Sequence, residues 1–260
     1  MELLRFYAGA FSRISGILGQ SLVFINHGSN FSAVVPYLGA NLGNLRRECE
    51  KLGLTHTLVH VNRTINFIEN QPPHALLAPL AQYVAEIQQR LIDELDERTM
   101  IAIPASRVSY YLDVDLFGKE VSNRFPSATI DIMEAGKCLA LNRNTASVFH
   151  LMRVMETGLR ALARSLSDPR LDPTRNPSWE TILKKCDDEL GKPIIERSIE
   201  WRSDNSFFST AVANLRAVKD AWRNPTMHIE QTYNDETALE VWNAVRAFMR
   251  HLATKFSEIT

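Results

Sequence analysis

The chain is poor in cysteine and lacks histidine clusters, and both absences exclude classes of site. Among 260 residues there are only three cysteines, Cys49, Cys138 and Cys186, which lie far apart and form no Cys-x-x-Cys pair. A disulfide framework or zinc site is therefore not expected, and a reducing cytosol is the natural compartment. The seven histidines form no His-Glu-x-x-His or His-x-His pattern, so we expect no metal and no other cofactor.

A strong excess of one charge is also lacking. The formal net charge is -1, from 29 basic and 30 acidic residues. Proteins that coat nucleic acid through bulk charge usually carry a basic excess, so this class is disfavoured, whereas a local basic cleft is still allowed. Hydrophobic residues make up 45% of the chain, which is enough to build a buried core.

No run of about 18 apolar residues is present to span a bilayer, and we expect no membrane partner. The first 26 residues are fairly apolar, but Arg5 and Arg13 interrupt them and no basic segment precedes a clean apolar stretch, so a secretory signal peptide is not expected. Their helical spacing favours an amphipathic packing helix, with a helix that binds a membrane surface or a partner as the alternative. The spaced apolar residues are Leu3, Leu4, Tyr7, Phe11, Ile14 and Leu18.

Helical periodicity continues through the rest of the first half. It predicts helix over 36–69, with a break expected at Gly53, and over 74–97 after Gln71-Pro72-Pro73. Residues 99–112 are the only strand-like stretch, because they combine β-branched and aromatic side chains.

Pro104 limits any strand in this stretch to a short or edge position. Residues 113–125 are predicted to form a short helix and a turn. Residues 1–125 are therefore expected to form a mainly helical N-terminal domain.

From residue 126 the pattern is cleaner and predicts an all-α fold, an antiparallel helical bundle over 126–260. The expected helices cover 126–141, 145–166, 178–190, 194–223 and 235–257. Asn144 or Thr145 is the predicted N-cap of the second helix, and Asn234 or Thr232 that of the last.

Apolar spacing also predicts which side chains face the core of this bundle. Ile130 is expected inward on the first helix and Ile199 on the fourth, which is expected to be interrupted near Ser203-Asn205. The expected buried face of the second helix is Val148, Leu151, Met152, Met155, Leu159 and Leu162.

The polar turn before the last helix holds the first candidate site, Arg223-Asn224-Pro225-Thr226-Met227-His228. A long helix delivers Arg223 at its last turn, and Pro225 biases the residue before it away from helical torsions. A guanidinium suits phosphate, and an imidazole can move a proton near neutral pH. With Asn224 to orient them, Arg223 and His228 could activate a ribose 2′-hydroxyl and stabilise the charged phosphate, without a metal.

The bare spacing of arginine and histidine is a weak signal. It occurs twice more in the chain, at Arg143…His150 and Arg246…His251. The alternative interpretation of 223–228 is a helix-terminal arginine, a turn asparagine and a histidine satisfied by packing.

Placement and surrounding sequence strengthen the interpretation of this turn. The segments AGKCLALNRNTASVFHLMRVMETGLRALA and AVKDAWRNPTMHIE, followed by the apolar last helix, resemble HEPN domains over about residues 126–256. These are small helical bundles in which Arg-x4-6-His follows the third core helix, often with a polar residue directly after the arginine.

The resemblance implies a metal-independent endoribonuclease. Arg223 and His228 would be its catalytic residues and Asn224 their support. It also implies RNA as a partner, a homodimer in which two motifs face one cleft, and a role in toxin–antitoxin pairs, with an antitoxin protein as a further partner, or in phage defence. A non-catalytic HEPN scaffold that binds RNA, nucleotide or a partner protein is the alternative, and a purely structural helical protein is a third.

Further residues could assist such a site. The resemblance suggests Glu156 as a catalytic helper, with an ion pair to Arg153 or Arg160 as the alternative. His150 could line the same cleft and bind RNA, with a place in the core as the alternative.

Basic residues of the second half could bind RNA phosphates. Arg216, Lys219 and Arg223 are spaced by three and four and can share a helix face, which suits a phosphate track, and Arg153 adds positive charge. The alternative is a solvated face balanced by acidic neighbours, Asp220 and Glu230.

Overall fold

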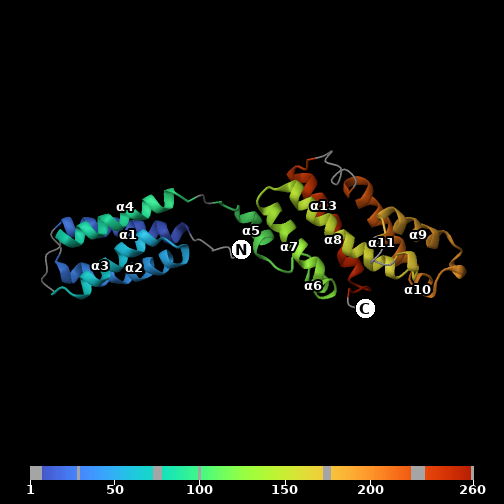
Figure 1. Cartoon of the computed structure of the whole chain (residues 1–260), viewed down its shortest axis with the longest axis horizontal. Coiled ribbons are helices and arrows are strands. Elements are labelled where there is room, and N and C mark those ends of the chain that lie inside the picture. The colour runs from blue at the N-terminus through green and yellow to red at the C-terminus, as the bar shows by residue number, and fades with distance from the viewer. Residues whose placement is uncertain are drawn as a thin grey trace. The chain divides into compact units, whose positions relative to one another are not determined.

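The computed structural model describes residues 8–27, 30–72, 78–98, 101–171, 177–223 and 232–258, except for the side chains at 8–11, 24 and 223. Every regular element within these ranges is helical, which confirms the predicted all-α class. The chain divides into two compact units, Met1–Ile101 and Ala102–Thr260, which are considered separately (Figure 1). The division falls before the predicted boundary at residue 125 because α5 and α6 pack against α7 of the second unit.

The first unit consists of α1 (Ala8–Asn26), α2 (Phe31–Leu52), α3 (Thr55–Glu69) and α4 (Ala78–Asp96). Each helix packs against its neighbours in sequence, and α1 also packs against α4, so the four helices enclose one core (Figure 1). Ile14 and Leu18 are buried, as the packing-helix interpretation predicts, whereas Leu3, Leu4 and Tyr7 and the side chain of Phe11 lie outside the described residues.

The predicted break at Gly53 is confirmed. Gly53 has a φ of 63°, and the amide groups of Gly53 and Leu54 donate to the carbonyl groups of Glu50 and Cys49. This closure of a helix end requires a left-handed residue, which glycine adopts at no steric cost.

The start of α3 is capped by a residue from another helix. Leu54 provides no side-chain cap, and the Glu94 carboxylate on α4 accepts from the amide groups of His56 and Thr57 at 3.0 and 2.7 Å. The pKa of Glu94 is lowered: burial acts to raise it, but the hydrogen bonds from Thr57 and His56 outweigh that effect.

The second unit surrounds α8, which packs against α7, α9 and α13 (Figure 1). Its elements are the 3₁₀ turn η1 (Ala105–Arg107), α5 (Val108–Leu112), α6 (Lys119–Arg124), α7 (Pro126–Ala140), α8 (Asn144–Arg164), the 3₁₀ turn η2 (Pro169–Leu171), α9 (Trp179–Gly191), the 3₁₀ turn η4 (Ile194–Glu196), α10 (Ile199–Ser203), α11 (Asn205–Val218), the π-helix η5 (Lys219–Arg223) and α13 (Asp235–Leu252). The predicted buried face of α8 is confirmed in full.

The predicted strand at 99–112 is wrong for the described part of that stretch. η1 and α5 form there instead. Tyr110 packs edge-on against Trp242 with ring centroids 5.3 Å apart, so an aromatic residue that indicates a strand in isolation serves helix packing here.

The predicted inward face of α7 is also wrong at Ile130, which is 72% exposed. The buried face is shifted to Ile132, Ala135, Gly136 and Leu139. A Cβ at Gly136 would lie 2.5 Å from the carbonyl oxygen of Tyr110, so the close approach of α5 sets the rotation of α7.

The predicted N-cap of α8 is wrong as well. Asn144 is the first helical residue, and Arg143 precedes it without a side-chain cap. Asn142 takes a left-handed φ of 57°, and the Arg143 amide donates to the Cys138 carbonyl, so the turn is used to close α7.

The two predictions for the helix over 194–223 have different outcomes. The interruption is confirmed, since α10 ends at Ser203 and Asp204 caps α11 through the Phe207 amide. Ile199 is not inward but 78% exposed, because the five-residue α10 turns Trp201 into the core.

Candidate functional site at the start of helices α8 and α13

The predicted Arg-x4-His motif begins at the end of the π-helix η5. This element follows α11 and ends at Arg223. The side chain of Arg223, and Asn224 and His228 entirely, lie outside the described residues. Their predicted meeting around one phosphate therefore stays a prediction.

The π-helix itself is a local departure from regular helix. Its i→i+5 hydrogen bonds widen the turn, an arrangement that is rare and is found mostly as single turns, frequently at functional sites. Here the widened turn covers Lys219 and Arg223, both of which were predicted to contact RNA.

A hydrogen bond joins residues 222 and 233, which lie on either side of the part of the motif outside the described residues. The hydroxyl of the buried Tyr233 donates to the carbonyl oxygen of Trp222 at 3.1 Å. The Tyr233 amide donates to Oγ1 of Thr145, in the first turn of α8, at 3.1 Å. The described residues on the two sides of 224–231 are therefore linked through Tyr233, whose amide lies beside the beginning of α8.

Arg107 braces this end of the unit. Its guanidinium donates to the Leu139 carbonyl at 2.8 Å and also to the side chains of Asn142 and Asp235. One side chain thus connects η1, the end of α7 and the first turn of α13. Hydrogen bonds from a charged donor are stronger than neutral ones, so Arg107 stabilises the packing of these three elements.

Two buried acceptor atoms lie at the same end. Oδ1 of Asn144 and Oδ1 of Asp235 have no hydrogen-bond partner among the described residues. Buried acceptors are normally satisfied, so a donor brought close to either oxygen would be stabilised there.

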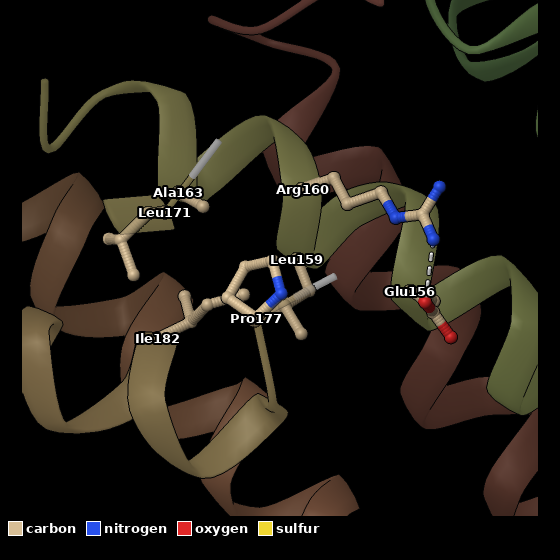
Figure 2. A pocket seen from close by; sticks show the side chains of 7 residues that line it. All are labelled: Glu156, Leu159, Arg160, Ala163, Leu171, Pro177 and Ile182. Atoms are coloured by element: carbon tan, nitrogen blue, oxygen red, sulfur yellow. Dashed lines mark hydrogen bonds and ion pairs between the residues drawn. The ribbon is translucent and has the colours of Figure 1, made fainter. Parts of the chain in front are cut away.

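Glu156 lies further along α8 and is committed to an ion pair. Its Oε1 is 2.8 Å from Nη2 of Arg160, the alternative that the sequence left open, and its side chain is 47% exposed. Figure 2 shows the two side chains pointing toward one another beside a cavity of about 90 Å³. Apolar residues make up the rest of the cavity lining: Leu159, Ala163, Leu171, Pro177 and Ile182.

This cavity is too small for a nucleotide, because ligand pockets usually measure about 300–1,000 Å³. The side chains of the predicted catalytic partners of Glu156 lie outside the described residues. A hydrogen bond to Asp131 and the charge of Glu156 both raise the pKa of the nearby Arg153. The helper role of Glu156 stays a prediction, whereas the arrangement seen is an exposed i,i+4 pair of modest strength.

The predicted phosphate track on α11 and η5 is neutralised by acids of α9. Arg216 is paired with Asp187, and Nζ of Lys219 lies 2.6 Å from Glu180 and 3.5 Å from Asp220. The hydrogen bond to Glu180 raises the pKa of Lys219 and lowers that of Glu180. These cations lie on a face balanced by acids, with Asp187 and Glu180 from α9 adding to the predicted neighbour Asp220.

His150 and Arg153 are brought together by Asp131 of α7. Nδ1 of His150 and Nε of Arg153 each lie 2.8 Å from Oδ1 of Asp131. His150 is partly exposed, so it is not a core residue. The pKa of Arg153 is raised by its hydrogen bond to Asp131, which keeps the guanidinium charged.

The two other arginine–histidine spacings do not build a paired site. No contact between Arg143 and His150 is present in the described residues. His251 is placed by Phe207: its Nε2 lies 3.0 Å from the Phe207 carbonyl oxygen, and the two rings stack at 4.4 Å. Packing therefore accounts for His251.

Sequence reasoning missed four residues that organise this region: Arg107, Asp131, Thr145 and Tyr233. The hydrogen bonds of Thr145 with Tyr233 and of Arg107 with Asp235 join residues 88 and 128 positions apart. No local pattern signals such pairs. The confirmed N-cap of Asn234, which accepts from the Thr237 amide, was the one local signal for where α13 begins.

The first unit has a groove of its own between α2 and α3, with a volume of about 550 Å³. Gly39 and Gly43 form part of its wall, with apolar Val35 and Ile65 and the cations Arg46 and Arg47. Its charges are mixed, because Glu50 and Glu69 also line it. No residue predicted for the site lies in this groove.

The described ranges contain neither a membrane-spanning helix nor a cluster of metal ligands. None of their helices has the length and apolar character needed to cross a bilayer. The same ranges contain no group of three or more histidine, cysteine or acidic side chains placed to hold a metal ion. Cys49 and Cys186 are buried, which raises the pKa of each thiol to about 12 and leaves both thiols protonated.

Comparison with known proteins adds no name to this geometry. No protein-family model matches the chain, and no curated protein and no solved structure matches it significantly.

Proposed function

We propose that the protein is a metal-independent endoribonuclease that cleaves RNA by attack of the ribose 2′-hydroxyl. The proposal rests on the Arg223-Asn224…His228 sequence and its resemblance to HEPN domains. The structural observation that supports it is that Tyr233 donates both to the Trp222 carbonyl and to Thr145 at the start of α8. Because residues on both sides of the motif are linked to one another, the side chains of the motif can be presented to one ligand.

In the proposed reaction His228 accepts the proton of the 2′-hydroxyl as the 2′ oxygen attacks the adjacent phosphorus. The bond from phosphorus to the 5′ oxygen breaks, and that oxygen takes a proton from water. Arg223 stabilises the negative charge on the phosphate oxygens, and Asn224 orients the two groups. The products are a 2′,3′-cyclic phosphate and a free 5′-hydroxyl. A homodimer that joins two such motifs in one cleft remains part of the proposal, as do an antitoxin partner and a role in toxin–antitoxin pairs or phage defence.

The surroundings of the motif suit an anionic substrate. The first turn of α8 has no acidic residue, and its N-cap Arg143 adds a cation without capping the helix. The positive end of a 21-residue helix therefore lies beside Tyr233, which follows the motif.

A non-catalytic scaffold is the second candidate, and one observation favours it. Arg216, Lys219 and Glu156, which would help a nuclease, are all engaged in ion pairs with neighbouring side chains. A scaffold that binds a partner protein would not need these groups to be free.

The test is incubation of the full chain with structured and unstructured RNA in EDTA. We expect cleavage by the wild type and a loss of at least about 100-fold with His228→Ala or Arg223→Ala, the range typical of general acid–base catalysis. Arg246→Ala is the matched control, because Arg246…His251 has the same spacing within the regular helix α13.

Cleavage that survives both site substitutions would remove the proposed active site. Binding without cleavage across many RNAs would favour the scaffold.

A further inference from the structure

The first half of α8 carries an exposed surface that the proposed catalytic motif does not use. Phe149 is 44% exposed, although a phenylalanine at a helix surface is normally turned inward. Arg153 follows it by four residues, so the two side chains share one face of the helix. Arg143, at the start of α8, is exposed as well.

Asp131 orients the guanidinium of Arg153 but accepts a hydrogen bond from only one of its nitrogens. Nε donates to Asp131, which is held in turn by His150, while Nη1 and Nη2 donate no hydrogen bond within the described residues. Its side chain is 60% exposed. The outer edge of the fork is therefore open to a second anion.

The other cations of the second unit that were predicted to bind RNA differ in this respect. Arg216 uses a terminal nitrogen on Asp187, and Lys219 is only 14% exposed and touches two acids. The guanidinium of Arg143, like the outer edge of Arg153, makes no ion pair or hydrogen bond in the described part of the chain. Along α8, one of these cations therefore precedes the exposed aromatic ring of Phe149 and the other follows it.

We propose that Phe149 and Arg153, together with Arg143 at the start of the same helix, bind single-stranded RNA. An unpaired base stacks on Phe149, and the two guanidinium groups contact phosphates on either side of it. A cationic surface with an exposed aromatic ring is the usual means of binding single strands, because every base has a face that can stack. This inference rests on the proposed function in taking RNA as the ligand.

The location supports the same ligand. Thr145, Phe149 and Arg153 follow one another at four-residue intervals along α8, and Thr145 is the residue that anchors Tyr233. An RNA strand bound along this face would run toward the end of α8 at which Tyr233 is held.

The experiment measures the affinity of the full chain for a short unstructured oligoribonucleotide with 2′-fluoro sugars. Such an RNA lacks the attacking hydroxyl, so binding is observed without cleavage. We expect Phe149→Ala to weaken binding about tenfold, the effect of losing one stacked base, and Phe149→Trp to retain it. Both changes are at an exposed position and should leave the fold intact.

The salt dependence tests the cations. Arg143→Ala or Arg153→Ala should each reduce the slope of log affinity against log salt by about 0.7, the value for one single-strand phosphate contact. Arg160→Ala is the matched control, because Arg160 is an exposed arginine of α8 that is already paired with Glu156. Its slope and affinity should match the wild type.

Two outcomes separate this inference from the proposed function. Unchanged affinity in Phe149→Ala and Arg153→Ala would overturn RNA binding by this surface, even if His228-dependent cleavage is observed. The same unchanged affinity would be seen if the surface docks a protein instead of RNA. Phe149-dependent binding together with absence of cleavage would support the surface and reject the nuclease.

Discussion

The two units of this chain stabilise all-helical folds with different kinds of core. The first unit buries aliphatic side chains, and Phe31 is the one aromatic residue in its fully buried cluster as described. The second unit buries two tryptophans completely, Trp201 and Trp242, together with Phe117, Phe208 and Phe248. Large rings fix the rotation of each helix more strongly than short aliphatic groups do, because they fit in fewer ways.

The glycines show the same contrast. In the first unit, Gly39 and Gly43 have open space where a Cβ would stand, as far as the described residues go. In the second unit, a Cβ at Gly136 or Gly158 would meet neighbouring atoms at 2.5 and 2.7 Å. The comparison indicates that the second unit, which holds the candidate site, is the more closely fitted of the two.

The largest expected effect is that of Trp242→Ala. Trp242 is 2% exposed and packs edge-on against Tyr110 and Phe117, so its removal should lower the unfolding free energy of the second unit by about 3–5 kcal/mol. Tryptophan fluorescence in urea reports the second unit alone, since all four tryptophans lie after residue 101.

The matched substitution in the first unit is Leu42→Ala. It should shift the unfolding curve measured by circular dichroism. The urea midpoint of the tryptophan fluorescence transition should stay unchanged. A shift of the fluorescence midpoint by Leu42→Ala would contradict the division of the chain into two compact units.

Gly136→Ala should be the next most damaging change. The added methyl group meets a backbone carbonyl oxygen, which cannot rotate away, so we expect a loss of about 1–3 kcal/mol from the second unit. The same urea titration measures it. A neutral effect would show that α5 is less closely packed on α7 than the structure indicates.

Glu94→Gln tests the long-range cap of α3. The neutral side chain should lower the unfolding free energy of the first unit by about 1 kcal/mol at neutral pH. Because the folded pKa of Glu94 is lowered, its contribution is complete above the ordinary glutamate value of 4.5 and is lost as the pH falls through the folded pKa.

The variant should therefore lose less stability than the wild type on acidification, as measured by circular dichroism in urea at several pH values. Parallel curves for the two proteins would contradict the cap.

The smallest expected effect is a gain. Gly43→Ala in α2 should stabilise the first unit by about 0.5–1 kcal/mol, because alanine favours helix and the groove has room for a methyl group. Thermal unfolding followed by circular dichroism measures it, and Gly53→Ala is the control. That residue has a φ of 63°, so its substitution should destabilise the same unit.

Much of the fold could be predicted from the sequence, and the failures have a common cause. Periodicity located α8 and its buried face, Gly53 marked a helix end, and Asn234 marked a helix start. The predictions that Ile130 is buried and that residues 99–112 form a strand were wrong. Both depend on the approach of α5 to Gly136, which is a contact between separate segments. Local spacing carries no information on such an approach.

The candidate site, too, could be predicted from the sequence only in part. The sequence identified His150 and Arg153, yet Asp131, which joins them, lies in another helix. It also suggested a phosphate track on Arg216 and Lys219, whose acidic partners come largely from α9. Charge along one helix can be counted from sequence, whereas its neutralisation by a second helix depends on the packing of the two.

The most direct test of the proposed nuclease uses an oligonucleotide that is DNA except for a single ribonucleotide, incubated with the full chain in EDTA. Attack by the 2′-hydroxyl predicts one cut, directly after the ribonucleotide, with a 2′,3′-cyclic phosphate on one product and a 5′-hydroxyl on the other, and no cut by His228→Ala. Cleavage at deoxyribose positions, or a product with a 3′-hydroxyl, would contradict the account.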